Sequence, residues 1–198
     1  MGIDMSKETI EFDDGSVYKG ELNQDGQFHG NGDMVWGNGA KYSGKWENDK
    51  MTGWGKYTFM DGKIHIGIFK DGLPNGAGLE NYKNGDIYDG DFKNGARHGK
   101  GIMKYPDGAY YKGTFENGLP VGIGTEVFNN GDKYVGEYKD GVGHGKGTMT
   151  FGDGRDKLEG IWENGEFVPI FIIVIFFAYG AFHKYKDYNP PVHILNIL

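Results

Sequence analysis

Residues 111–133 read YKGTFENGLPVGIGTEVFNNGDK, and this stretch decides the fold. It contains two turn signals, Asn117-Gly118 and Asn130-Gly131. Asn-Gly is a strong signal for a tight turn between two strands, because glycine adopts a positive φ without strain and asparagine tolerates one. The segments that flank the first turn are five to seven residues long, which is enough for a strand. The stretch therefore predicts a β-hairpin.

The residues of this hairpin also predict how it packs. Side chains of a strand alternate between its two faces, so Tyr111, Gly113 and Phe115 share one face. In the second segment, 122–128, both glycines and the phenylalanine share a face by the same alternation. We expect an aromatic ring of one strand to lie across a glycine of the next. Aromatic cross-strand packing stabilises a sheet, and it would offset the cost of glycine inside a strand.

The same pattern recurs along the chain with a fixed period. The phrase Tyr-x-Gly-x-aromatic, or a close variant, starts at residues 18, 42, 65, 88, 111 and 134, with steps of 24 and then 23 residues. A Gly-x-Gly pair follows in each unit, and an aromatic residue comes four positions after each pair. Half units at both ends extend the register. Six units at this spacing indicate a repeat protein, in which neighbouring units bury each other's surface.

The repeats predict an all-β fold, namely an elongated, twisted antiparallel sheet of consecutive β-hairpins with about fourteen strands. We divide the chain into an N-terminal segment 1–7, a repeat array 8–166 and a hydrophobic C-terminal tail 167–198. The array holds six full units of 23 or 24 residues and a half unit at each end. The sequence leaves the structure of the tail uncertain.

Composition restricts the class of protein and its partners. Glycine accounts for 37 of 198 residues without a Gly-X-Y period, and aromatic residues make up 15%, which excludes collagen and argues against a disordered chain. The formal net charge of −7 argues against nucleic acid as a partner, because phosphate backbones bind basic surfaces. The chain has no cysteine, which fits a reducing compartment, and its N-terminus has no apolar core typical of a secretory signal. We expect a cytoplasmic location.

The repeat resembles the membrane occupation and recognition nexus (MORN) repeat, whose pattern reads YxGxWxxGxxxGxGxxxxxDG. The resemblance covers about four-fifths of the chain, with small departures such as Leu22 for tryptophan and His65 for tyrosine. It implies a binding or scaffolding role without catalysis, and no catalytic residue, cofactor or metal is expected. MORN repeats occur in junctophilins, which carry a C-terminal membrane anchor, and in scaffolds that hold a peptide or helix of a partner.

Two functions therefore remain open. The first is a scaffold or adaptor that binds a helix or an extended peptide of a partner protein, such as a cytoskeletal one, along its glycine and aromatic groove. We expect exposed rings on the groove face to make this contact, because aromatic residues are enriched at binding hot spots. These rings are Tyr42, Trp46, Phe69, Tyr88, Phe92, Tyr111, Phe115, Tyr134 and Tyr138. The second function is a membrane-associated tether or phospholipid-binding module of the junctophilin type.

Other polar residues suggest no site. His29, His98 and His144 each precede a Gly-x-Gly pair, but they belong to different units that the sheet should hold apart. We interpret them as repeat-consensus turn residues. The Gly-x-Gly pairs are followed by strands, whereas phosphate-binding loops need a following helix.

Both ends of the chain carry separate signals. Gly2 and Ser6 fit the N-myristoylation form, which makes Gly2 a candidate lipidation site. Residues 170–182 are thirteen consecutive nonpolar residues. They fit a membrane anchor, although they are short for one, or a cap over the open sheet edge or groove, or a misassigned coding region. The incomplete terminal hairpins also predict unpaired strands through which two copies could form a homodimer.

Overall fold

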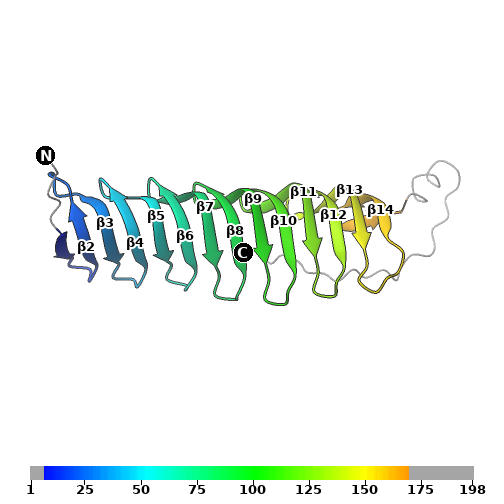
Figure 1. Ribbon diagram of the computed structural model, residues 1–198, viewed down its shortest axis with the longest axis horizontal. Coiled ribbons are helices and arrows are strands. Elements are labelled where there is room, and N and C mark those ends of the chain that lie inside the picture. The colour runs from blue at the N-terminus through cyan, green and yellow to red at the C-terminus, as the bar shows by residue number, and fades with distance from the viewer. Residues whose placement is uncertain (1–6, 170–198) are drawn as a thin grey trace. The chain divides into compact units, whose positions relative to one another are not determined.

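The computed structural model describes residues 7–169, and these residues form fifteen β-strands and no helix (Figure 1). The strands follow one another in chain order in a single open antiparallel sheet of consecutive hairpins. The predicted all-β hairpin array is therefore confirmed. The signals at Gly2 and at residues 170–182 lie outside the described residues.

The first nine strands are β1 (Lys7–Glu11), β2 (Val17–Leu22), β3 (Phe28–Val35), β4 (Lys41–Glu47), β5 (Lys50–Thr58), β6 (Ile64–Lys70), β7 (Leu73–Asn81), β8 (Ile87–Lys93) and β9 (Ala96–Lys104). The other six are β10 (Tyr110–Glu116), β11 (Leu119–Val127), β12 (Lys133–Lys139), β13 (Val142–Thr150), β14 (Leu158–Glu163) and β15 (Glu166–Val168). The short β15 pairs with β14, so the last hairpin ends at Val168. This is two residues beyond residue 166, where the sequence places the end of the repeat array.

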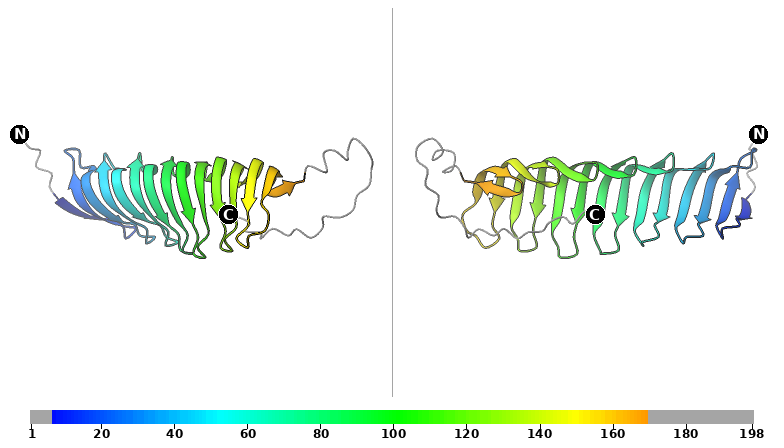
Figure 2. Two further views of the ribbon diagram at one scale, coloured as in Figure 1. Left: turned by 45° about the vertical axis from the view of Figure 1, so that its right-hand side comes forward. Right: turned by 180° about the vertical axis from the view of Figure 1, so that it is seen from behind.

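The described residues divide into two compact units. The first unit comprises residues 7–110 and 115–118, and the second comprises residues 111–114 and 119–169. Strands β1 to β9 pair in order within the first unit, and β11 to β15 pair in order within the second. Figure 2 shows, for each unit, that every strand lies beside its neighbour in the sequence.

Two kinds of turn alternate along the chain. In the second to sixth units the internal turn has two residues, such as Asn94 and Gly95 with φ angles of 49° and 85°, which is the type I′ geometry that asparagine and glycine favour. In the first unit the internal turn is longer and covers residues 23–27. The turn at the end of a unit is longer. There the amide of Phe128 donates to the carbonyl of Asp132, the amide of Gly131 donates to the carbonyl of Phe128, and only Gly131 has a positive φ.

In the second, third, fourth and sixth repeats, the two glycines of the Gly-x-Gly pair face opposite sides of the sheet. Gly44 pairs with Gly55, but Lys45 pairs with Thr52, so β5 bulges by two residues at Gly53 and the residue after it. A methyl group added at Gly53 would meet the side chain of Lys45, whereas one added at Gly55 would meet the ring of Tyr42. In these four repeats the prediction that both glycines share the ring-bearing face is therefore wrong, because a bulge such as that at Gly53 interrupts the alternation of side chains.

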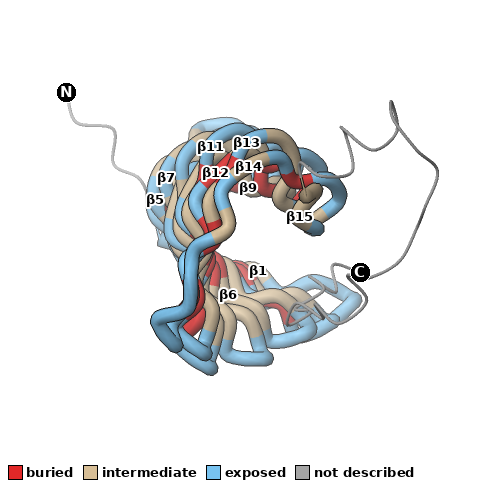
Figure 3. Tube along the Cα trace, turned by 90° about the vertical axis from the view of Figure 1, so that its right-hand side faces the viewer, coloured by how far each residue is buried: buried red, intermediate tan, exposed pale blue. Residues whose placement is uncertain are grey.

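The core is a row of aromatic rings in mutual contact on one face of the sheet, which we call the ring ladder. In the first unit it runs through Tyr18, Trp46, Tyr42, Phe69, His65, Phe92, Tyr88 and Phe115, with consecutive ring centroids 4.6–5.7 Å apart. In the second unit it runs through Tyr111, Tyr138, Tyr134, Trp162 and Phe167. All contacts are edge to face, the arrangement that aromatic quadrupoles favour. Most buried residues lie within the strands, where they alternate with more exposed ones, and the turns are mainly exposed (Figure 3).

Candidate functional site

The structure places every ring predicted to contact a partner in the ring ladder. Tyr42, Trp46, Phe69, Tyr88, Phe92, Tyr111, Phe115, Tyr134 and Tyr138 are each no more than 5% exposed. The expectation that these rings are exposed is therefore wrong. Their contact with a partner stays a prediction, and each of them offers a partner very little surface.

Tyr42 shows why these rings are buried. Its side chain lies across Gly44 and Gly55, where an added Cβ would stand 2.5 Å from the hydroxyl oxygen of Tyr42, so only glycine leaves room for it. Phe69 of the following repeat covers the ring edge to face at 5.2 Å. The hydroxyl donates to the carbonyl of Lys45 at 3.0 Å, and burial raises the pKa of Tyr42 to about 12, so the hydroxyl remains a donor. The predicted packing of rings across glycines is confirmed here.

A second row of rings lies on the same face of the first unit and remains half-buried. We call them the hairpin-end rings: Trp36, Tyr57, Phe59, Tyr82 and Tyr105. Tyr57 lies 5.4 Å from Trp36 and 4.6 Å from Phe59 between ring centroids, so the row is continuous there. Sequence reasoning did not select these residues as contacts. Their position in the repeat could have indicated them, because most of them stand four positions after a Gly-x-Gly pair, where no glycine lies beneath the ring.

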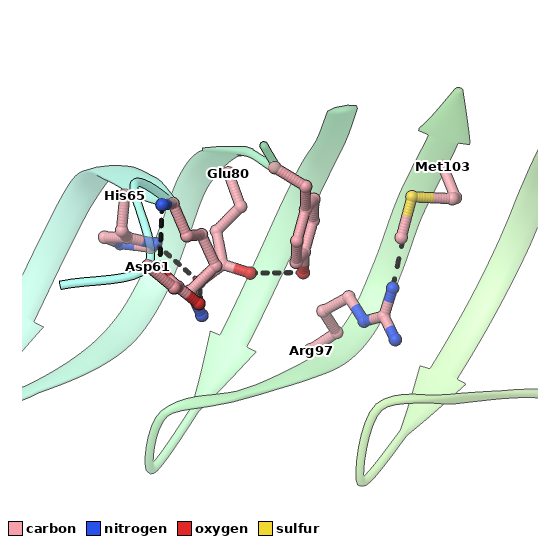
Figure 4. Close-up of polar contacts among 7 residues, drawn as sticks. Asp61, His65, Glu80, Arg97 and Met103 are labelled. Atoms are coloured by element: carbon pink, nitrogen blue, oxygen red, sulfur yellow. Dashed lines mark hydrogen bonds and ion pairs between the residues drawn. The ribbon is translucent and has the colours of Figure 1, made fainter. Parts of the chain in front are cut away.

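A polar cluster interrupts this face beside the third repeat (Figure 4). Glu80 is buried, and its carboxylate accepts hydrogen bonds from Lys63 Nζ at 3.0 Å and from the hydroxyl of Tyr82. His65, which stands where other repeats have tyrosine, is fully buried with Nδ1 3.7 Å from Glu80 Oε1. Burial raises the pKa of Glu80, but the contacts with His65, Tyr82 and Lys63 outweigh it and lower the pKa to about 2.

This cluster predicts a loss of stability in acid. The pKa of a glutamate carboxyl in the unfolded chain is about 4.5, and the pKa of Glu80 in the folded protein is about 2. A carboxylate with a depressed folded pKa stabilises the fold above the unfolded value, and its contribution is lost as the pH falls from about 4.5 toward 2. Urea unfolding of the wild type should show this loss, and Glu80→Gln should reduce it. Tyr82→Phe, which removes one donor, should move the loss to higher pH. Identical pH profiles for all three proteins would contradict the assignment.

The histidines that precede the Gly-x-Gly pairs lie in strands. His29 is in β3, His98 in β9 and His144 in β13, so the expectation that they lie in turns is wrong. β3, β9 and β13 each start one or two residues before the histidine, directly after the preceding turn. Within residues 7–169, no group of three or more histidine, aspartate or glutamate side chains is placed to hold a metal ion.

A shallow cavity with a volume of about 430 Å³ lies in the first unit, on the face opposite the ring ladder. Lys7 and Lys19 line it together with Glu8 and Asp33, and the rest of the lining is neutral. Its charges balance, so the cavity shows no preference for an anionic or a cationic ligand.

Two solved structures that match this chain do so at low sequence identity. The TCP domain of SAS-4 (dCPAP) from Drosophila melanogaster, in complex with a proline-rich motif of Ana2 (dSTIL), is 15% identical with a TM-score of 0.44, over 79% of this chain and 90% of that chain. The wild-type TCP10 domain of CPAP from Danio rerio is 18% identical with a TM-score of 0.25, over 74% of this chain and 85% of that chain. No curated protein matches the sequence.

None of the described residues belongs to a helix that is long and apolar enough to cross a membrane. The family comparison is specific. The MORN repeat model matches six consecutive segments, residues 18–41, 42–64, 65–87, 88–110, 111–133 and 134–154. These segments have the same bounds as the hairpin units built from the Tyr-x-Gly phrase, apart from the end of the sixth. The chain belongs to the MORN-repeat family.

Proposed function

We propose that this chain is a non-catalytic scaffold that binds a segment of a partner protein along its ring-bearing face. The MORN-repeat family is in general non-catalytic. The observation that carries the proposal is the row of hairpin-end rings, which are half-buried on one face of consecutive hairpins. They offer aromatic surface to a helix or an extended peptide, such as a segment of a cytoskeletal protein, while the ring ladder supports them. We propose a cytoplasmic location for this activity.

Selection of peptides from a random display library against the full chain tests this proposal. Selected peptides should lose affinity by about tenfold or more for Tyr57→Ala, because truncation of an aromatic anchor removes a contact hot spot. Ile123→Ala is the control, since Ile123 is 66% exposed and points away from the rings. Peptides that lose affinity for the control variant and keep it for Tyr57→Ala would show that the binding face is the opposite one.

A second candidate function is a membrane-associated tether or phospholipid-binding module. It is favoured by Gly2, which fits an acylation form, and by the apolar run at residues 170–182. Flotation with liposomes of the full chain and of a chain ending at Val168, the last residue of β15, tests this function. If only the full chain floats, the tether is supported. If neither floats and the shorter chain melts earlier, the tail acts as a cap and the tether is rejected.

A further inference from the structure

The face opposite the ring ladder, which we call the outer face, carries an apolar cluster where the second repeat meets the third. Four apolar side chains meet there on β5, β6 and β7, namely Trp54, Ile66, Ile68 and Leu79, and we call them the apolar patch. Trp54 is 63% exposed and Ile66 is 37% exposed. The positions equivalent to Ile66 in the two neighbouring repeats are Ser43 and Asp89. Ile66 therefore makes this part of the outer face more apolar than the same position in the neighbouring repeats. A contiguous apolar surface of this kind indicates an interaction, because soluble proteins rarely expose one.

The strand register makes this patch continuous. Trp54 pairs with Ile68 across β5 and β6, and Ile66 pairs with Leu79 across β6 and β7. The side chain of Ile68 also lies close to Gly76, whose missing side chain leaves it room. Ala77 follows Gly76 on the outer face, so β7 presents a small side chain at the level where β5 presents a tryptophan. The patch therefore has a raised side at β5 and a low side at β7.

Opposite charges flank the patch on its two sides. Lys45 on β4 and Lys56 on β5 lie on the first side, and Asp89 and Asp91 on β8 lie on the second. The register places Lys56 opposite Ile66, Asp89 opposite Leu79, and Asp91 opposite Ala77. Within residues 7–169, no ion pair uses any of these four charged side chains. Across the sheet the outer face thus runs from basic to apolar to acidic.

We propose that the apolar patch binds a second copy of this chain, face to face, about a twofold axis parallel to β6. A twofold axis parallel to the strands reverses the order of the strands in the second copy, but it leaves the position of each residue along the strand direction unchanged. The basic side of one copy therefore meets the acidic side of the other. Trp54 then lies over Ala77 of the second copy, and Lys45 lies opposite Asp91 of the second copy. Each contact occurs twice, as an isologous interface requires, and packed sheets of this kind lie about 10 Å apart.

This dimer adds a property to the proposed scaffold. The ring-bearing face lies on the other side of the sheet and stays free, so one dimer presents two such faces. Two linked faces bind a partner that carries two target segments more tightly than either face alone, because the second contact becomes intramolecular. The dimer does not depend on the proposed function, and its failure would leave the peptide-binding test unaffected.

Sedimentation velocity of the full chain over a range of concentrations tests the interface. The wild type should show a monomer–dimer equilibrium, and Trp54→Lys should be monomeric over the same range. Ile123→Lys is the matched control, because Ile123 occupies the equivalent position in the fifth repeat and is 66% exposed. This variant should dimerise like the wild type. A monomeric wild type, or a dimer that Trp54→Lys leaves intact, would overturn the proposal, and the latter would direct attention to the terminal hairpins.

A charge reversal provides a second test with substitutions that alter only exposed side chains. Lys45→Glu places a carboxylate opposite Asp91 of the second copy at two symmetric positions, and it should weaken dimerisation by about tenfold. Adding Asp91→Lys to the same chain restores opposite charges at both positions, so the double variant should regain most of the affinity. A double variant as weak as Lys45→Glu, or weaker, would exclude this orientation of the two copies.

Discussion

Replacing Trp46 by alanine is expected to lower the free energy of unfolding of the first unit by about 4 kcal/mol, the range found when a buried large ring is deleted. Trp46 is 3% exposed and contacts the rings of Tyr18, Phe28 and Tyr42 edge to face. Its indole nitrogen also donates to the carbonyl of Gly32 at 3.1 Å. Alanine would remove the three ring contacts and this hydrogen bond together, and it would leave a cavity beside Tyr42.

Urea unfolding measured by far-ultraviolet circular dichroism tests this expectation, and Trp46→Phe is the control. Phenylalanine already occupies the equivalent ladder position at Phe69 and Phe92. The control should therefore keep the ring packing and lose mainly the hydrogen bond, at a cost of about 1 kcal/mol. If the alanine and phenylalanine variants lowered the free energy of unfolding equally, the ladder contacts would not be what holds the unit together.

Replacing Gly44 by alanine is expected to cost about 3 kcal/mol or more, because the methyl group has no space. Its Cβ would stand 2.5 Å from the hydroxyl oxygen of Tyr42 and 2.6 Å from the Cα of Gly55 on the next strand. The second contact is with backbone, so the two strands would have to separate, and overpacking of this kind is strongly destabilising.

Gly108→Ala is the matched control for this substitution. Gly108 has a φ of 91° and no heavy atom within 4 Å of an added Cβ. Alanine there meets only the conformational cost of a positive φ, about 1 kcal/mol. If the Gly108 variant lost as much stability as the Gly44 variant, backbone conformation rather than ring packing would explain the glycine content of the sheet.

The turns and the repeat period could be predicted from the sequence because both are local. Asn-Gly specifies a tight turn through the backbone preferences of two residues. The packing of Tyr42 across Gly44 and Gly55 followed from the strand alternation and from the size of the side chains. The opposite orientation of Gly53 did not follow, because a bulge changes the alternation and no single residue type reveals its register.

The burial of the ring ladder could not be predicted from one unit alone. Tyr42 is covered by Phe69, which is 27 positions further along the chain, so its exposure depends on how the next repeat packs. The Glu80 cluster was also missed, since its partners are scattered over two turns and one strand, with Lys63 and Tyr82 in the turns and His65 in β6. The hairpin-end rings belonged to the repeat pattern, but their partial exposure depends on the absence of a glycine beneath each ring.

The ring ladder also determines how an array of this kind can change its length. Each ladder tyrosine is covered by the ring four positions after the start of the following repeat, as Phe69 covers Tyr42. Deleting residues 65–87 would bring Phe92 to the position of Phe69, and the ladder would close again over Tyr42. A deletion of part of a repeat would leave one tyrosine uncovered and one glycine pair without its ring. Insertions and deletions that evolution retains should therefore come in whole repeats, which makes the repeat the unit of inheritance as well as of packing.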